Sequence, residues 1–213
     1  MSRPRILLAD DHRLVAEGLK QLLTPEFELL GVVEDGRELV KEAKRLRPDV
    51  IVADITMPHL NGIDALEQLK KKDPQARVVF LTMHREVAYA RRALDAGASG
   101  FILKHSAPEE LVMAIRAALN GQKYITPTIA GELFESVQKD PKSAKDPVTS
   151  LTPRQREILQ LLAEGKTAKE IAALLDISTR TVEFHKYNLM EKLGLRTAAE
   201  LTHCAIKHGL VSV

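Results

Sequence analysis

The chain has 213 residues and a formal net charge of only +2, with 45% apolar and 28% charged residues. This composition is typical of a globular protein with one large domain or two small ones, and it excludes a strongly basic chain that would bind nucleic acid through bulk charge. No apolar run reaches the roughly 18 residues of a membrane-spanning helix. The N-terminus lacks a signal-peptide pattern, and Cys204 is the sole cysteine, so we expect a cytoplasmic protein without an intrachain disulfide.

Short apolar runs alternate with helical patterns through the first 120 residues. The runs are Ile6–Ala9, Leu29–Val33, Val50–Ala53, Val78–Leu81 and Phe101–Leu103. The helical stretches are Leu14–Leu23, Gly36–Leu46, Asn61–Lys72, Glu86–Ala96 and Pro108–Asn120. This order predicts an α/β fold, a flavodoxin-like, doubly wound five-stranded parallel sheet with helices on both faces. The loops that follow the strands then gather at one edge, where such sheets bind ligands.

The pattern changes after this region. Residues 125–137 favour a helix, and residues 139–147 are polar and contain two prolines, which is typical of a flexible linker. From Leu151 onward the pattern is purely helical. Helices are predicted from Thr152-Pro153 to Gly165, over Ala168–Leu175, from Ser178 to Leu193, and over Ala198–His208. We therefore expect an α/β domain at 1–121, a linker at 122–149 and an all-α four-helix domain at 150–213.

Polar side chains follow four of the predicted strands. Asp10 and Asp11 follow the first strand and Asp54 follows the third, while Thr82 and Lys104 follow the fourth and fifth. Three carboxylates in one cleft repel each other, and Mg²⁺ relieves such a cluster. A hydroxyl and an ammonium beside the carboxylates complete a phosphoryl-binding constellation, with Asp54 as nucleophile.

Each of these side chains has an ordinary structural role when it is considered alone. A strand-end aspartate is usually a helix cap or a turn residue, Thr82 alone is a cap, and Lys104 alone is a solvated lysine. Asp10 and Asp11 also favour the dipole of the helix that follows them. The joint placement at the ends of separate strands is what favours the functional interpretation.

These residues resemble the receiver domain of two-component response regulators over residues 3–121. The resemblance rests on Asp10-Asp11, on the segment from Asp54 to Gly62, and on Thr82 and Lys104. It implies Asp54 as phosphoacceptor and Mg²⁺ as cofactor, with Asp10, Asp11, Asp54 and the backbone carbonyl of Thr56 at the metal. It further implies Thr82 and Lys104 as phosphate partners, and Thr82 and the aromatic Phe101 as switch residues.

Two features depart from or vary within this family. His105 follows Lys104, where many receivers have a proline. Thr56 and His84 occupy variable positions, each two residues after a key residue, which in the family tune the lifetime of the phosphoryl group.

The C-terminal region resembles a LuxR-type helix-turn-helix over residues 150–210. The matching segments are Leu151–Leu159, Lys169–Ala172, Ser178–His185, Lys192-Leu193 and Arg196–Ala198. A receiver followed by this module resembles the NarL/FixJ class of response regulators. The resemblance implies binding to double-stranded promoter DNA, a homodimer on activation or DNA binding, and contact with RNA polymerase.

The third helix of this region is the expected recognition helix. Val182, Leu189 and Leu193 form its apolar stripe, and Val182 is also predicted to be one of the DNA-binding residues. Candidates for base contacts are Glu183, Phe184, Lys186 and Tyr187, and candidates for phosphate contacts are Lys169, Thr179, Arg180, Thr181 and Lys192. Glu183 either accepts from cytosine N4 or pairs with a neighbouring basic residue. Phe184 either contacts a thymine methyl group or packs partly in the core.

These observations predict a phosphorylation-dependent transcription regulator that takes a phosphoryl group from a sensor histidine kinase and is not a turnover enzyme. In the expected mechanism Thr82 and Lys104 approach the phosphoryl group and Phe101 repacks inward, which biases dimerisation and frees the C-terminal domain. Two rivals are a phosphatase with an aspartyl nucleophile and a LuxR-type sensor of a small molecule. Against the first, Thr56 stands where an acid/base carboxylate is usual. Against the second, aromatic residues make up only 4%. A third alternative keeps DNA binding but makes it independent of phosphate.

Overall fold

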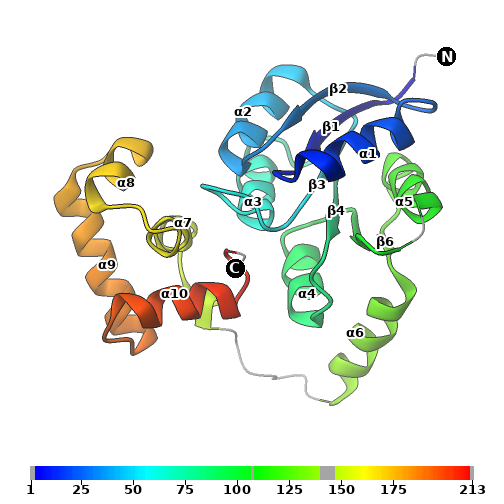
Figure 1. The fold of residues 1–213 in the computed structure, drawn as a ribbon. Coiled ribbons are helices and arrows are strands. Elements are labelled where there is room, and N and C mark those ends of the chain that lie inside the picture. Colours follow the sequence, from blue (N-terminus) through cyan, green and yellow to red (C-terminus); the bar gives the residue numbers. More distant parts are fainter. Residues whose placement is uncertain (1–2, 107, 140–146, 212–213) are drawn as a thin grey trace. The chain divides into compact units, whose positions relative to one another are not determined.

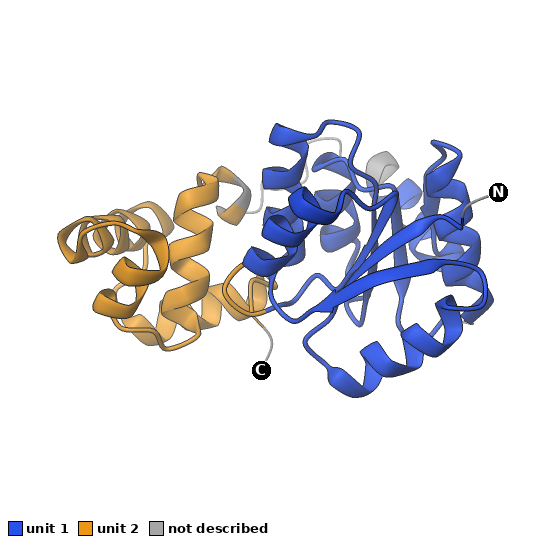
Figure 2. Cartoon of the chain, turned by 90° about the horizontal axis from the view of Figure 1, so that it is seen from above, with its two compact units in different colours: residues 1–57, 61–141 blue, residues 58–60, 142–213 orange. Residues whose placement is uncertain are grey.

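The computed structural model describes residues 3–106, 108–139 and 147–211. The chain divides into two compact units (Figure 2), one of residues 1–57 and 61–141 and the other of residues 58–60 and 142–213. Within the described ranges no helix combines the length and the apolar character needed to cross a membrane.

A six-stranded parallel sheet forms the centre of the first unit, in the order β2-β1-β3-β4-β5-β6. The strands are Arg5–Ala9 (β1), Glu28–Val33 (β2), Val50–Ala53 (β3), Val78–Thr82 (β4), Gly100–Leu103 (β5) and Tyr124–Ile125 (β6). Strands β3, β4 and β5 are buried along their whole length, as continuous apolar runs predict for a sheet covered on both faces.

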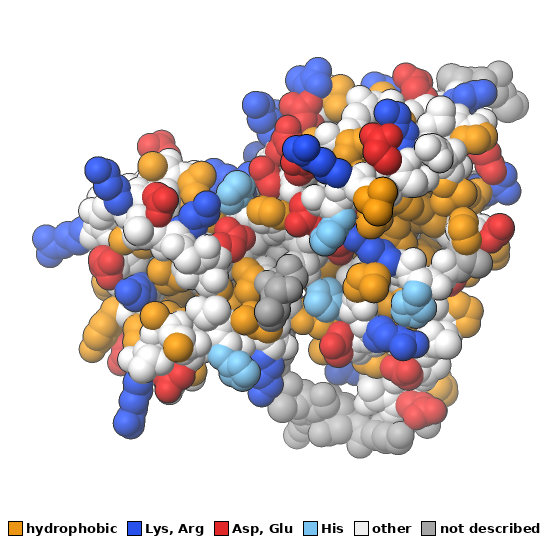
Figure 3. All heavy atoms as spheres, viewed as in Figure 1, with side chains coloured by type: hydrophobic (Ala, Val, Ile, Leu, Met, Phe, Trp, Pro, Cys, Tyr) orange, Lys and Arg blue, Asp and Glu red, His pale blue; other side chains and the backbone are white. Residues whose placement is uncertain are grey.

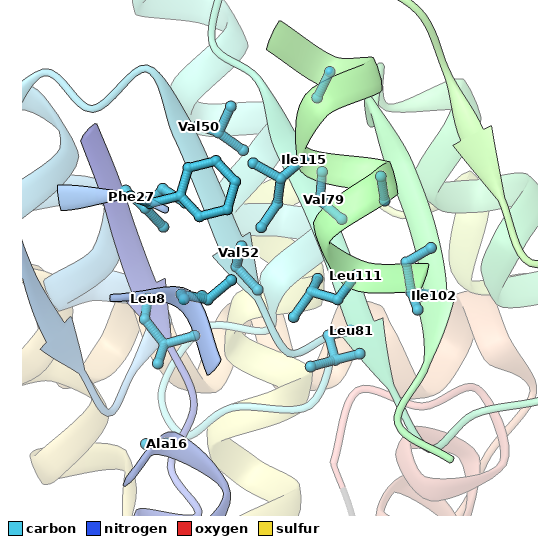
Figure 4. Close-up of a cluster of buried hydrophobic side chains, with 14 residues drawn as sticks. Leu8, Ala16, Phe27, Val50, Val52, Val79, Leu81, Ile102, Leu111 and Ile115 are labelled. Atoms are coloured by element: carbon cyan, nitrogen blue, oxygen red, sulfur yellow. The ribbon is translucent and has the colours of Figure 1, made fainter. Parts of the chain in front are cut away.

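Helices cover both faces of this sheet (Figure 1). The five that follow β1 to β5 are Arg13–Leu23 (α1), Gly36–Leu46 (α2), Gly62–Lys72 (α3), Val87–Asp95 (α4) and Pro108–Leu119 (α5). On one face, Ala16 of α1 and Leu111 and Ile115 of α5 pack against strand residues such as Val52 and Val79 (Figure 4). This core holds the strands in register and so fixes where their carboxyl ends lie.

The region after α5 contains the predicted helix, but it also contains a sixth strand that was not predicted from the sequence. Tyr124 and Ile125 form β6, which pairs with Gly100 and Phe101 of β5. The following helix, Pro127–Lys139 (α6), belongs to the first unit and packs against α4, where Arg91 donates to Ser136 Oγ at 3.0 Å. A two-residue strand is too short to show an alternating pattern. Most of the expected flexible segment, residues 140–146, lies outside the described residues.

The second unit is helical, as predicted. After a short 3₁₀ turn at Pro147–Ser150 come Pro153–Ala163 (α7), Ala168–Leu175 (α8), Thr179–Leu193 (α9) and Ala198–Lys207 (α10). Capping boxes begin α7, α8 and α10, and Ser178 caps α9 by accepting from the Thr181 N–H. The four helices share one apolar core, whose buried members include Ile158, Ile171, Val182 and Leu201.

Candidate functional site

The predicted polar residues meet at the carboxyl edge of the sheet. Asp10 and Asp54 directly follow β1 and β3, Thr82 ends β4, and Lys104 directly follows β5. Backbone hydrogen bonds continue the strand pairing past the strand ends: the Asp54 N–H donates to the Ala9 carbonyl at 2.8 Å, and the Lys104 N–H donates to the Thr82 carbonyl at 2.8 Å. The position of each functional side chain is therefore set by the sheet.

A buried ion pair lies at the centre of this site. Lys104 Nζ is 2.6 Å from Asp54 Oδ2 and 2.8 Å from Asp10 Oδ2. Asp10 is 2% exposed and Asp54 is 5% exposed. The other carboxylate oxygen of Asp54, Oδ1, accepts a hydrogen bond from the Ile55 N–H at 2.6 Å. One ammonium thus bridges two carboxylates that are nearly removed from water.

The directions of the pKa shifts in this pair indicate that the cleft holds too little positive charge. Burial raises the pKa of the Asp54 carboxyl above its ordinary value, and the Asp10 carboxylate adds to this rise, while Lys104 opposes it. Desolvation lowers the pKa of Lys104, but the Asp54 and Asp10 carboxylates outweigh it and the net pKa is raised. Lys104 therefore keeps its positive charge, but this one charge does not fully compensate the negative charges of Asp10 and Asp54.

The remaining acidic residue makes the cleft suitable for a divalent cation. Oxygen or nitrogen atoms of Asp10, Asp11, His12 and Asp54 all lie within 4.8 Å of one another. Asp11 Oδ1 is buried and makes no hydrogen bond within the described part of the chain, although His12 Nδ1 lies 2.9 Å away. Carboxylate oxygens are the ligands that Mg²⁺ prefers. The donor set fits that ion, and the Thr56 carbonyl remains a prediction from the resemblance.

The two predicted switch residues are both fully buried. Thr82 Oγ1 accepts from the His84 N–H at 3.2 Å. Phe101 lies in β5 opposite Phe80 of β4 and is 0% exposed. Phe101 is thus already in the inward arrangement that the sequence analysis assigned to the phosphorylated state, so the expected inward repacking does not start from this conformation.

A contact across the mouth of the cleft was not predicted. His84 Nε2 lies 2.7 Å from Thr56 Oγ1, and the His84 ring stacks on Tyr89 with ring centroids 4.3 Å apart. The sequence singled out Thr56 and His84 as separate variable positions. Their hydrogen bond depends on loops after β3 and β4, whose conformation has no periodic signal in the sequence. The peptide bond between Lys104 and His105 is trans.

Gly62 lies in the segment on which the receiver resemblance rests, but no role was predicted for it from the sequence. It begins α3, and its N–H donates to the Ile55 carbonyl at 2.7 Å, which holds the helix against the loop that carries Asp54. The preceding Asn61 caps the helix through its side chain, which accepts from the Asp64 N–H. The Asn-Gly pair was the available signal, since such pairs mark tight turns.

Helix α9 divides the predicted DNA-binding residues between two faces. The Val182 side chain is 0% exposed and belongs to the core, so it supports the helix from behind and does not face outward. Phe184 is 62% exposed and Tyr187 is 71% exposed, and Glu183 is exposed beside them. Lys186 is half-buried. The outer face that could contact bases is therefore narrower than predicted and consists of Glu183, Phe184 and Tyr187.

The candidates for phosphate contacts lie at helix ends. Lys169 on α8 and Thr179 and Arg180 on α9 are exposed, whereas the Thr181 hydroxyl lies 2.8 Å from Ser178 Oγ in the cap. Lys192 is exposed and its Nζ donates to the Ser150 carbonyl at 2.5 Å. Basic and acidic side chains are interspersed on the visible face of the second unit (Figure 3), in keeping with its small net charge. Any attraction to DNA must therefore come from the placement of a few cations.

Two sequence families match the chain. The family described as response regulator receiver domain matches residues 6–116. The family described as bacterial regulatory proteins, luxR family, matches residues 149–205. Each match covers one of the regions predicted from the sequence, and the first contains the whole acidic cleft.

Several relatives match nearly end to end. The chain is 39% identical over 211 residues to the transcriptional regulatory protein MctR of Rhizobium johnstonii, covering 98% of this chain and 95% of that protein. It is 33% identical over 207 residues to the response regulator UvrY of Escherichia coli, covering 96% and 94%. Among solved structures, RcsB of Salmonella enterica serovar Typhimurium bound to promoter P1flhDC with BeF₃⁻ matches with 28% identity and a TM-score of 0.63, covering 95% of this chain and 98% of RcsB.

Proposed function

Because the chain belongs to the two-component response regulators that carry a receiver domain and a LuxR-type DNA-binding domain, we propose that phosphorylation of Asp54 controls its binding to promoter DNA. The observation that carries this proposal is the convergence of Lys104 on Asp54 and Asp10 in one buried acidic cleft. The phosphoryl donor is a sensor histidine kinase.

The phosphoacceptor chemistry follows from the groups in the cleft. A carboxylate oxygen of Asp54 attacks the phosphorus of phosphohistidine, and an O–P bond forms as the P–N bond breaks. The imidazole leaves as a neutral ring, because its other nitrogen already carries a proton. Lys104 exchanges part of its contact with the carboxylates for the new phosphoryl oxygens, and the Thr82 hydroxyl donates to one of them. Asp10, Asp11, Asp54 and the Thr56 carbonyl would hold Mg²⁺, which would supply the missing positive charge.

The product carries more negative charge than the cleft held before. An acyl phosphate carries about two negative charges beside Asp10 and Asp11, in place of the single charge of the Asp54 carboxylate. We expect the Thr82 side chain to turn toward it and to leave the His84 N–H, which would move the loop after β4. That loop leads into α4, against which α6 packs within the first unit. The response to phosphate therefore starts at α4, while Phe101 is already buried in β5.

The second unit supplies the DNA contacts. Helix α9 enters the major groove with Glu183, Phe184 and Tyr187 outward, while cations at the helix ends hold phosphates. Lys169, Arg180 and Lys192 are those cations, and Lys192 leaves the Ser150 carbonyl when it does so. Two chains bind as a homodimer to an inverted repeat whose half-sites lie roughly 34 Å apart. Such a dimer, placed beside a promoter, meets RNA polymerase in the cytoplasm.

The coupling between phosphate and DNA is expected to be moderate. Coupling free energies between two sites are typically about 1–3 kcal/mol, so the unphosphorylated chain retains some affinity. The chain releases its phosphoryl group by slow self-hydrolysis and has no other turnover.

One pair of measurements tests the proposal. The full-length chain is incubated with acetyl phosphate and Mg²⁺, its phosphorylated fraction is measured on a phosphate-binding gel, and its affinity for duplexes recovered from genomic DNA is measured with and without the donor. Phosphorylation in the wild type and none in Asp54→Asn supports the proposal, as does a 5- to 150-fold gain in affinity, about the range that such coupling spans.

The rival functions give different outcomes in the same experiment. Continued release of phosphate from small phosphomonoesters indicates a phosphatase. Equal DNA affinity of wild type and Asp54→Asn under all conditions indicates a regulator that works without phosphate. DNA binding that responds only to a small apolar effector indicates a ligand sensor.

A further inference from the structure

The outer face of α9 carries an unusual set of side chains for a surface that binds DNA. Phe184 and Tyr187 are the only large apolar side chains that are strongly exposed among the described residues of the second unit. Glu183, directly before Phe184, is exposed and makes no hydrogen bond or ion pair within that part of the chain. The aromatic ring of Phe184 and the unpaired carboxylate of Glu183 are thus adjacent along α9, where base contacts are expected.

The fold of the second unit does not account for these residues. Its core is closed on the opposite side of α9 by Val182 and Leu189, which are both 0% exposed. The Phe184 ring makes an edge contact with the neighbouring His185 ring, at a centroid separation of 5.9 Å. An apolar ring left in water adds nothing to stability, and its burial on binding is favourable. The sequence left open that Phe184 packs partly in the core and that Glu183 pairs with a basic residue. Within the described residues Phe184 is not a member of the core cluster and Glu183 has no ion pair.

A carboxylate in this position also restricts the ligand. DNA phosphates repel it, so Glu183 weakens binding to any duplex that offers it no hydrogen-bond donor. In the major groove, donors are presented only by cytosine N4 and adenine N6, and carboxylates pair with cytosine. The methyl group of thymine is the one apolar feature of the same groove, and it suits an aromatic ring.

We propose that Glu183 and Phe184 read two pyrimidines of each half-site, with Glu183 accepting from the N4 amino group of a cytosine and Phe184 packing on the methyl group of a thymine. This inference rests on the proposed function, because it requires α9 to enter the major groove. Tyr187, one turn further along the helix, covers the thymine contact and excludes water from it.

The test begins with selection of duplexes from a random pool by the full-length chain, treated with acetyl phosphate and Mg²⁺. The best duplex is then remade with single thymines replaced by deoxyuridine, which removes one methyl group and keeps every hydrogen bond. At one position of each half-site we expect wild-type affinity to fall about fourfold, the effect of one buried methyl group. Phe184→Ala should lose this sensitivity, so that it binds both duplexes equally.

The carboxylate is tested by a change of preference. Because a glutamine amide pairs with adenine N6 and N7, Glu183→Gln should select adenine where the wild type selects cytosine. The matched control is Glu191→Gln, which removes the same charge from an exposed position two turns along α9. It should raise affinity for all duplexes by a similar factor and leave the selected sequence unchanged. Thermal unfolding midpoints confirm that the surface variants remain folded.

The outcomes separate this inference from the function on which it rests. If the wild type selects no sequence and binds no duplex, the proposed function is wrong and so are the base assignments that depend on it. If the wild type selects a sequence that neither Phe184→Ala nor Glu183→Gln alters, DNA binding stands and this inference is wrong. A change of the selected base in Glu183→Gln together with loss of the uracil effect in Phe184→Ala establishes it.

Discussion

The α-carbon of Gly62 lies so close to Asp54 that a Cβ atom at position 62 would be 2.2 Å from the Asp54 carbonyl oxygen. The same atom would be 2.9 Å from the ring of Phe80. Neither neighbour can move easily, because one is backbone and the other is fully buried. The start of α3 therefore packs against the main chain of the phosphoacceptor, and only glycine permits that approach.

We expect Gly62→Ala to destabilise the first unit and displace Asp54. Overpacking of a buried site typically costs about 1–3 kcal/mol, and relief by a shift of the Asp54 backbone should also slow phosphorylation by acetyl phosphate. Urea unfolding and the initial phosphorylation rate measure the two effects. The matched control is Gly131→Ala in α6, where no atom lies within 4 Å of the added Cβ and helix propensity favours alanine by roughly 0.5–1 kcal/mol. Equal stability of the two variants would contradict the steric argument.

The raised pKa of Asp54 predicts that this carboxyl destabilises the folded protein increasingly as pH rises. Burial favours the protonated form of the Asp54 carboxyl in the folded state. The stability that the protonated carboxyl contributes is present below its unfolded pKa, near 3.8, and is lost as pH rises through its folded pKa. Without Mg²⁺, Asp54→Asn should therefore gain stability relative to the wild type as pH rises through this window, and keep the advantage at neutral pH. Thermal unfolding midpoints of both proteins from acid to neutral pH provide the measurement.

Magnesium supplies the control for this pH effect. Bound Mg²⁺ compensates the Asp54 charge and stabilises the fold by mass action, so it should raise the neutral-pH midpoint of the wild type more than that of Asp54→Asn. A difference between the proteins that is independent of both pH and Mg²⁺ would show that desolvation of Asp54 is not its cause.

Much of the fold could be predicted because it depends on repeated patterns. The β-branched runs and the amphipathic stretches between them placed all five long strands and their helices within one or two residues. Thr152, Ser178 and Gly194 marked helix ends through local chemistry that a sequence displays. Tyr124 and Ile125 could not be predicted as β6, because their pairing with β5 is a tertiary contact with no local signal.

The site was predictable where topology alone fixes a position. Asp10, Asp54, Thr82 and Lys104 follow successive strands of one parallel sheet, so their convergence needed no knowledge of side-chain packing. The hydrogen bond between Thr56 and His84 joins two irregular loops, so it could not be predicted from the sequence. Burial of Val182 followed from its apolar stripe, whereas the outward direction of Phe184 depended on how the four helices share their core.

Lys104→Met should separate the role of the ammonium from that of the side chain's volume. The substitution leaves Asp10 and Asp54 adjacent and buried with no cation between them, and breaking a buried pair in this way typically costs about 3–5 kcal/mol. Part of that loss should return on adding Mg²⁺ or on lowering the pH until one carboxyl binds a proton. Lys104→Arg, which keeps the charge, should remain close to the wild type in stability. Urea unfolding with and without Mg²⁺ measures all three proteins, and a loss unaffected by Mg²⁺ would contradict the electrostatic explanation.

An apolar cleft beside Lys104 predicts where the phosphoryl donor docks. Residues of α1, of the β4 and β5 ends and of α5 line a cleft of about 420 Å³, which includes Leu14, Met83 and Lys104. Leu14 is 89% exposed and Met83 is 65% exposed. A protein donor must reach Asp54 over this edge of the sheet, and exposed apolar patches of this kind mark protein contacts.

Leu14→Glu should therefore slow phosphoryl transfer from a sensor histidine kinase and leave phosphorylation by acetyl phosphate unchanged. Loss of one buried leucine contact, about 1.5–3 kcal/mol, corresponds to a transfer rate roughly 10- to 150-fold lower at subsaturating kinase. Met113→Glu makes the same change at an exposed residue of α5 outside the cleft and should transfer at the wild-type rate. Because acetyl phosphate needs no docking surface, an equal loss with both donors would place the defect of Leu14→Glu in the acidic cleft and refute a docking role.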